Sequence, residues 1–272
     1  MSLEETGKKI QSIKFGKRKV LVRFADGDEL SFSKNAFTEQ PLYAEKVLSQ
    51  DEYKALLVLA SEDKITNAVL RYAVKELHTK HETIQYLYGK GADEKTAYRL
   101  IYKLEEEGLI NDELYATTYA RDVAGVKLYG RNRVLFDLKH KGIGDEILSS
   151  LQFDELTELS KARKFAALAN KKYAKNTNTK KMYKVTSALL RRGFDEHIAQ
   201  EAARLEFVMG DPELELERLK AEAQRVKARY SKKYHGYDLT RRVALSLARK
   251  GYPYEDIKAA LEEFDHEDYG ND

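Results

Sequence analysis

The pattern of hydrophobic and polar positions changes once along this chain. Between residues 9 and 33, apolar residues occupy every second position on either side of Asp26-Gly27. A period of two is typical of strands, and Asp-Gly favours the positive φ angles of a hairpin turn. We therefore predict a three-stranded meander that includes Phe15, Val22 and Phe32. Its apolar face needs cover, which we expect from the helix that follows.

From Ser49 onward the pattern is helical. Ser49-Gln50-Asp51-Glu52 and Thr79-Lys80-His81-Glu82 match the capping box, in which a hydroxyl and a carboxylate bond the free amides of a helix start. Asp211-Pro212 combines an N-cap residue with proline at the first helical position. These three segments predict three helix starts.

The helical part contains a four-fold internal repeat, in which a leucine is followed by a basic residue and glycine at the third and fourth positions after it. The copies are Leu87 with Lys90-Gly91, Leu138 with Lys141-Gly142, Leu189 with Arg192-Gly193, and Leu247 with Lys250-Gly251. Glycine in a left-handed conformation can end a helix, and a basic residue suits the negative end of the helix dipole. Because a further apolar helical pattern follows each glycine, each repeat is predicted to end in a helical hairpin.

A longer helix precedes several of these hairpins, for example at residues 113–123 and 156–173, which gives three helices per repeat. We predict a mainly α fold: an elongated solenoid of tandem three-helix repeats, preceded by a small β-rich N-terminal domain. The predicted parts are a β-rich domain at 1–48 and helical repeats at 49–110, 111–153, 154–210 and 211–272.

The sequence contains no motif for catalysis, metal binding or cofactor binding. The 272 residues include no cysteine, which excludes disulfides and thiolate ligands, and the 6 histidines do not follow a metal-ligand spacing. No phosphate-binding loop or catalytic motif occurs. We therefore expect no catalytic residue, no metal and no cofactor, and so no enzyme. The first ten residues lack the apolar core of a signal peptide, and no apolar run approaches the roughly 20 residues of a membrane span. A cytoplasmic protein without membrane contact is expected.

Charge is distributed unevenly. Residues 1–116 contain 18 Lys+Arg and 20 Asp+Glu, residues 117–204 contain 18 and 10, and residues 205–272 contain 12 and 15. The net charges of the three segments are therefore −2, +8 and −3. A basic middle segment suits a polyanion or an acidic protein surface, although solvated helix faces would explain it equally well.

The candidate binding residues lie in this middle segment. They are Arg121, Lys127, Arg131, Arg133, Lys139, Lys141, Lys171, Lys172, Lys180 and Lys181. Tyrosines lie among them and could stack on unpaired bases, but tyrosines at helical spacing are more often half-buried core. Two other functions remain open. The hairpin at 82–110 could be the helix-turn-helix of a transcription regulator, although acidic Glu105 to Glu107 disfavour this. An α-solenoid could also be a protein scaffold without nucleic acid.

The central segment resembles the signature of the RecX family of regulators of the RecA recombinase. The resemblance covers about residues 50–265. Its residues are Gly108-Leu109-Ile110-Asn111-Asp112-Glu113, Tyr115-Ala116, Tyr119, Arg121 to Val123, Gly130-Arg131, Val134, Leu138 and Lys141-Gly142-Ile143. The chain departs from the family pattern at Tyr115, where phenylalanine is usual, and at Asp137, where glutamate is usual.

The resemblance implies a non-enzymatic modulator of RecA, expected to be an inhibitor, that binds the RecA–DNA filament in DNA repair and recombination. It would alter filament assembly, ATP hydrolysis, strand exchange and the SOS co-protease activity. The implied partners are the RecA filament and, weakly and without sequence preference, single- or double-stranded DNA. We expect a monomer, with the ten basic residues facing the filament or its DNA.

Overall fold

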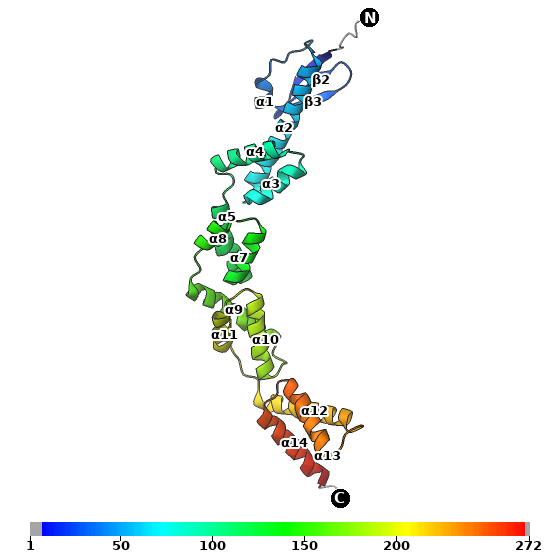
Figure 1. The fold of residues 1–272 in the computed structure, drawn as a ribbon, viewed down its shortest axis with the longest axis vertical. Coiled ribbons are helices and arrows are strands. Elements are labelled where there is room, and N and C mark those ends of the chain that lie inside the picture. Colours follow the sequence, from blue (N-terminus) through cyan, green and yellow to red (C-terminus); the bar gives the residue numbers. More distant parts are fainter. Residues whose placement is uncertain (1–6, 270–272) are drawn as a thin grey trace. The chain divides into compact units, whose positions relative to one another are not determined.

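The computed structural model describes residues 7–269, and their side chains as far as residue 262 (Figure 1). Residues 1–6 and 270–272, the ends of the predicted first and last parts, lie outside this range. The chain forms two compact units. The first contains the described residues up to Thr118 together with Leu138–Ser150, and the second contains Tyr119–Asp137 together with the described residues from Leu151 onward.

The first unit begins with a four-stranded antiparallel sheet of order β3-β2-β1-β4. Its strands are β1 (Lys8–Phe15), β2 (Lys19–Phe24), β3 (Glu29–Ser33) and β4 (Val47–Leu48). The three predicted strands and their order are confirmed, and Gly27 in the β2–β3 turn has φ 96°. β4 was not predicted, because two residues are too short to show an alternation.

One face of the sheet is covered by the first long helix, as expected. Val22, Phe24 and Phe32 are buried and pack in one cluster with Leu56 of α2 (Gln50–Lys75). The short helix α1 (Lys34–Thr38) also contributes Phe37 to this cluster. The meander therefore forms its core jointly with α2, since a small sheet cannot bury enough apolar surface alone.

The rest of the described chain is helical, so the mainly α fold with a small N-terminal sheet is confirmed. The further helices are α3 (Lys80–Gly89), α4 (Glu94–Glu106), α5 (Asp112–Thr118), the π-helical turn η1 (Tyr119–Val123), α6 (Ala124–Lys127), α7 (Arg131–His140), α8 (Asp145–Ser150), α9 (Glu155–Lys172), α10 (Asn178–Arg191), α11 (Glu196–Leu205), α12 (Pro212–Tyr230), α13 (Gly236–Arg249) and α14 (Tyr254–Tyr269). Both predicted capping boxes are present, at the starts of α2 and α3. Asp211 caps α12, with proline at its start.

One predicted helix is interrupted. The segment expected to be a single helix at 113–123 leaves the α form after Thr118 and continues as the π-helical turn η1. The hydroxyl of Tyr119 in this turn donates to Asp137 at 2.9 Å, and the residue is only 9% exposed. A π turn adds one residue to the hydrogen-bonded ring, which a hydrophobic pattern of period 3.6 does not reveal.

The repeated leucine and glycine positions behave as predicted. The four leucines are each 0% exposed, and the four glycines have φ between 81° and 88°. In each copy the amide after the glycine donates back to the leucine carbonyl, for example from Ile143 to Leu138 at 3.1 Å. This bond is typical of a Schellman helix end. The motif therefore closes α3, α7, α10 and α13 in the same way.

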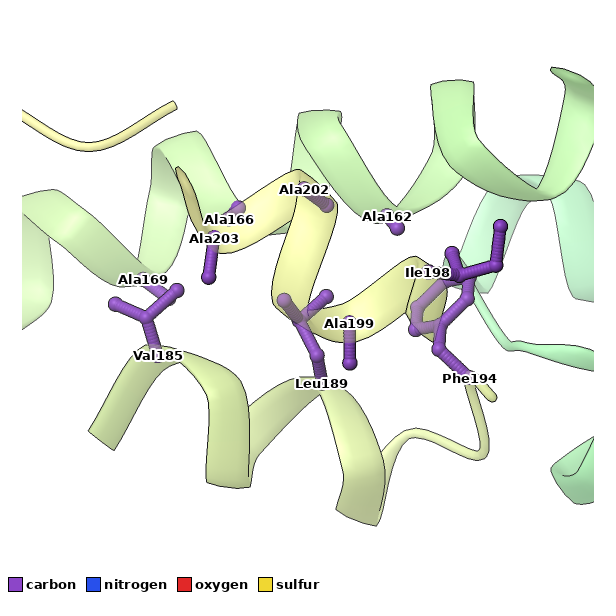
Figure 2. Close-up of a cluster of buried hydrophobic side chains, with 10 residues drawn as sticks. All are labelled: Ala162, Ala166, Ala169, Val185, Leu189, Phe194, Ile198, Ala199, Ala202 and Ala203. Carbon is purple, nitrogen blue, oxygen red and sulfur yellow. The ribbon is translucent and has the colours of Figure 1, made fainter. Parts of the chain in front are cut away.

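Small residues let the helices α9, α10 and α11 approach closely. Figure 2 shows their shared core, in which six alanines lie with the larger side chains of Val185, Leu189, Phe194 and Ile198. The alanines are Ala162, Ala166, Ala169, Ala199, Ala202 and Ala203. Close packing of this kind makes α9 and α10 rigid, and both helices carry exposed basic side chains, such as Lys172 and Lys180.

We predict that Leu138→Ala lowers the free energy of unfolding by about 2–5 kcal/mol, because it removes a fully buried leucine and leaves a cavity. Urea unfolding followed by circular dichroism measures the loss. Leu156→Ala is the matched control, since Leu156 is 76% exposed and should change little. Equal effects of the two substitutions would contradict the assignment of the repeated leucine to the core.

Candidate functional site

The start of α3 is joined to the end of α7 within the first unit. Thr79 donates from its hydroxyl to the carbonyl of Lys141 at 2.8 Å, and Glu82 forms an ion pair with the Lys141 amine at 2.5 Å. The backbone amide of Lys80 donates to Asp112 of α5 at 2.8 Å. The positive end of one helix dipole therefore meets the negative end of another, and a carboxylate satisfies a free amide.

The second unit contains two junctions of the same kind. At the start of α7, the Arg131 amide donates to Glu158 at 3.0 Å, and the Asn132 amide donates to the Gly193 carbonyl at 2.9 Å. At the start of α10, the Asn178 amide donates to Glu215 at 3.0 Å. In all three junctions a carboxylate of a later helix thus bonds the first amide of an earlier one.

The ion pair at the first junction makes stability depend on pH. Burial raises the pKa of Glu82, but hydrogen bonds from Lys141 and from the Thr79 amide outweigh it, so the pKa lies below its ordinary value of 4.5. Because the pKa of Glu82 is lowered by folding, its charged carboxylate stabilises the folded protein at pH values above the ordinary pKa. This stabilisation is lost as the pH falls through the lowered pKa.

We predict that Glu82→Gln destabilises the protein at about pH 7 and has a smaller effect at about pH 3, which lies below the ordinary pKa of 4.5, so that part of the stability contributed by the charged carboxylate is already lost. Urea unfolding at both pH values measures the difference. Glu106→Gln is the matched control, since Glu106 is an exposed glutamate on the neighbouring helix α4. A destabilisation by Glu82→Gln that does not change with pH would contradict a stabilising role for the carboxylate charge.

The predicted binding residues divide between the two units. Lys139 and Lys141 belong to the first unit, where Lys139 is 67% exposed and pairs with Asp145 at 2.9 Å. Lys141 is half-buried in the junction already described, with its amine 5.3 Å from the Tyr115 ring centre. The other eight lie in the second unit.

Four of these eight lie on the segment from η1 to α7. Arg121 is exposed and pairs with Asp122 at 2.7 Å. The amine of Lys127 lies 5.8 Å from the centre of the Tyr129 ring. The guanidinium carbon of Arg131 lies 5.7 Å from the centre of the Phe153 ring. Arg133 bonds Asp137 at 2.8 Å and also lies over aromatic rings. All four side chains are exposed.

The remaining four lie on α9 and α10 and differ in exposure. Lys171, Lys172 and Lys180 are exposed. Lys181 is only 4% exposed, and its amine donates to the carbonyl of Val208 at 2.5 Å. This corrects the expectation that Lys181 lies on the surface. Its position on the inner face of α10 turns the side chain into the protein, where a backbone carbonyl satisfies the charge.

The structure brings Arg133 and Lys172 together in one pocket with Arg191 and Arg192. Lys180 lines a second pocket, of about 220 Å³, which also contains Glu215 and Glu222 and is thus less suited to anions. Sequence reasoning did not include Arg191 and Arg192 among the candidates. The signal for them was present in the doubled arginine at the third copy of the repeat.

Two further findings concern other kinds of site. Among the described residues, no group of three or more His, Asp or Glu side chains is placed to hold a metal ion. In the same part of the chain, none of the helices is long and apolar enough to cross a membrane.

Comparisons with known proteins give a consistent result. A model of the third three-helix domain of RecX proteins matches residues 213–261. The regulatory protein RecX of Streptococcus agalactiae serotype Ia is 28% identical over 258 residues, which cover 94% of this chain and 99% of the relative. That of Lactococcus lactis subsp. cremoris SK11 is 26% identical over 263 residues, with 94% and 98% covered.

Solved structures show the same similarity. A crystal structure of a regulatory protein RecX matches with a TM-score of 0.58 at 21% identity, and the match covers 72% of this chain and 98% of the chain in that structure. This is a likeness of fold. The crystal structure of RecX from Lactobacillus salivarius has a TM-score of 0.50 at 26% identity, with 54% and 96% covered.

Proposed function

Because this chain belongs to the RecX family, we propose that it regulates the RecA recombinase by binding the RecA–DNA filament, without catalysing a reaction. The observation that carries the proposal is the similarity to regulatory RecX proteins over 94% of the chain. The exposed basic side chains of the second unit support it, since the DNA in such a filament carries phosphates.

We propose that the predicted basic residues that are exposed contact the filament or its DNA. In the second unit they are Arg121, Lys127, Arg131, Arg133, Lys171, Lys172 and Lys180, and in the first unit Lys139, to which we add the half-buried Lys141. In this proposal the parts at 49–110, 111–153, 154–210 and 211–272 are four successive binding repeats after the domain at 1–48. Contacts spread over several repeats give avidity without one dominant pocket.

The proposal also covers the compartment, the oligomeric state and the direction of the regulation. The protein would act as a cytoplasmic monomer and inhibit RecA by slowing filament growth, and so reduce ATP hydrolysis, strand exchange and the SOS co-protease activity. Any contact with DNA would be weak and independent of sequence, because basic side chains bind the phosphates that all sequences share.

Binding to preassembled RecA filaments at increasing salt tests the proposal. We expect saturable binding that weakens steeply between about 50 and 200 mM salt, as contacts to several phosphates require. A protein that binds no filament and no single-stranded DNA even at low salt would instead be a protein scaffold. Protection of one duplex sequence with a specificity ratio of about 10³ or more would favour a transcription regulator.

A further inference from the structure

We propose that a pocket in the second unit binds a nucleotide, with the base against aromatic side chains and the phosphate among arginine and lysine side chains. The pocket has a volume of about 420 Å³. Its lining comes from three segments: α9 with the residue after it, the end of α10, and the stretch from Tyr129 to Arg133. The inference rests on the proposed function, since the RecA–DNA filament would supply the nucleotide as part of a DNA strand.

The lining of the pocket is positively charged. It includes Arg133, Lys172, Arg191 and Arg192, and no aspartate or glutamate. Arg133 has a carboxylate neighbour, Asp137, at 2.8 Å, and Arg192 donates to a backbone carbonyl. Within the described part of the chain, Arg191 and Lys172 have no carboxylate partner, so their charges are available to an anion. Cations that lie together without carboxylates repel one another, and a bound phosphate relieves this repulsion.

Aromatic faces lie beside these charges. Tyr129, Phe165 and Tyr173 are half-buried and line the pocket. The guanidinium carbon of Arg192 lies 5.4 Å from the Tyr129 ring centre and 4.5 Å from that of Phe165, and Arg133 lies 5.4 Å from Tyr129. A planar base can stack on a tyrosine ring or on a guanidinium plane.

The lining of the pocket includes two small residues. Ala169 and Ala188, which are 4% and 8% exposed, lie in the lining where α9 and α10 pack together. The volume of about 420 Å³ falls within the usual range of roughly 300–1,000 Å³ for small-molecule sites. This size admits one nucleotide with an unstacked base, which single strands offer and paired duplexes do not.

The aromatic lining of the pocket favours a nucleotide over an acidic peptide as the ligand. A carboxylate side chain would use the four cations but would add no planar group to stack against Tyr129 or Tyr173. A nucleotide uses both kinds of group at once, because it has an anionic phosphate and a planar base.

Fluorescence anisotropy with a labelled oligothymidylate and the full-length protein tests the inference. Tyr129→Leu removes an aromatic face without changing charge and should weaken binding about tenfold, as loss of one stacked base does. Tyr173→Leu is a second variant of the same kind. Lys172→Gln with Arg191→Gln should lower the dependence of log affinity on log salt by about 1.4, since each phosphate that a cation neutralises on a single strand adds about 0.7 to that slope.

Lys232→Gln with Arg241→Gln is the matched control, because it removes the same charge from two exposed residues outside the pocket. It should leave affinity within about twofold. Circular dichroism confirms that every variant remains folded.

Competition identifies the source of the ligand. Displacement of the probe by thymidine monophosphate would support a site for free nucleotides, and displacement by oligothymidylate alone would support a site for strands. The proposal would be overturned if polyglutamate competed as well as oligothymidylate, or if neither tyrosine variant changed the affinity.

Parallel assays of RecA ATP hydrolysis separate this inference from the proposed function. If the wild-type protein changes hydrolysis while the pocket variants bind DNA normally, the pocket proposal fails and the proposed function stands. If the pocket variants lose DNA binding but the wild-type protein does not affect RecA, the proposed function fails instead.

Discussion

Replacing Gly193 by alanine is expected to lower the free energy of unfolding by about 2–5 kcal/mol, compared with about 1–2 kcal/mol for Gly91→Ala. Both glycines end a helix of the repeat with φ 85°, so alanine meets the same backbone strain at each. They differ in their surroundings. A Cβ at Gly91 would meet nothing within 4 Å, whereas one at Gly193 would lie under 3.0 Å from the backbone of Arg133.

The extra cost at Gly193 therefore reports the junction between α7 and α10. The backbone of α7 approaches the glycine so closely that the Asn132 amide donates to its carbonyl at 2.9 Å. Urea unfolding of the two variants side by side gives the difference directly, with Gly91→Ala as the control for strain. Equal losses in the two variants would show that the junction does not form as described.

Reversing the charges of Arg131 and Lys139 is expected to weaken filament binding at least about tenfold, because like charges would then face each other across the proposed interface. Both side chains are exposed, and the Lys139 pair with Asp145 is a surface contact that adds little stability. The double variant Arg131→Glu with Lys139→Glu should therefore keep its helical content and its urea midpoint. Binding to RecA filaments at fixed salt measures the decrease in affinity.

The control for this experiment is Lys232→Glu with Arg241→Glu, which imposes the same change of charge on two exposed residues outside the proposed surface. Filament binding by this control should stay close to wild type. If both double variants weakened binding equally, net charge would explain the effect. If neither did, the interface would lie on another part of the protein.

The main features of the fold were predictable because they depend on local signals. The two capping boxes and the glycine at the end of each repeat act within a few residues of themselves, and the structure confirms them. The π turn at Tyr119–Val123 and the short strand β4 were not predictable. Both depend on partners distant in sequence, such as Asp137 for Tyr119 and Lys8 for Leu48.

The site was predictable in composition rather than in detail. The charge count located the basic segment, but it could not show that Lys181 points inward to Val208 while Lys180 stays exposed. Nor could it place Arg133 beside Arg192, since the two are 59 residues apart (192 − 133) and meet only through the junction at Gly193. One-dimensional patterns give the face of a helix, whereas contacts between helices come from their packing.

DNA-dependent ATP hydrolysis by the RecA filament, with this protein titrated in below one copy per RecA subunit, tests the central claim most directly. Regulation of the filament predicts that hydrolysis falls at these substoichiometric amounts, together with direct binding to the filament. Unchanged hydrolysis and no binding, even at an excess of this protein, would contradict the claim and leave the similarity to RecX proteins as one of fold.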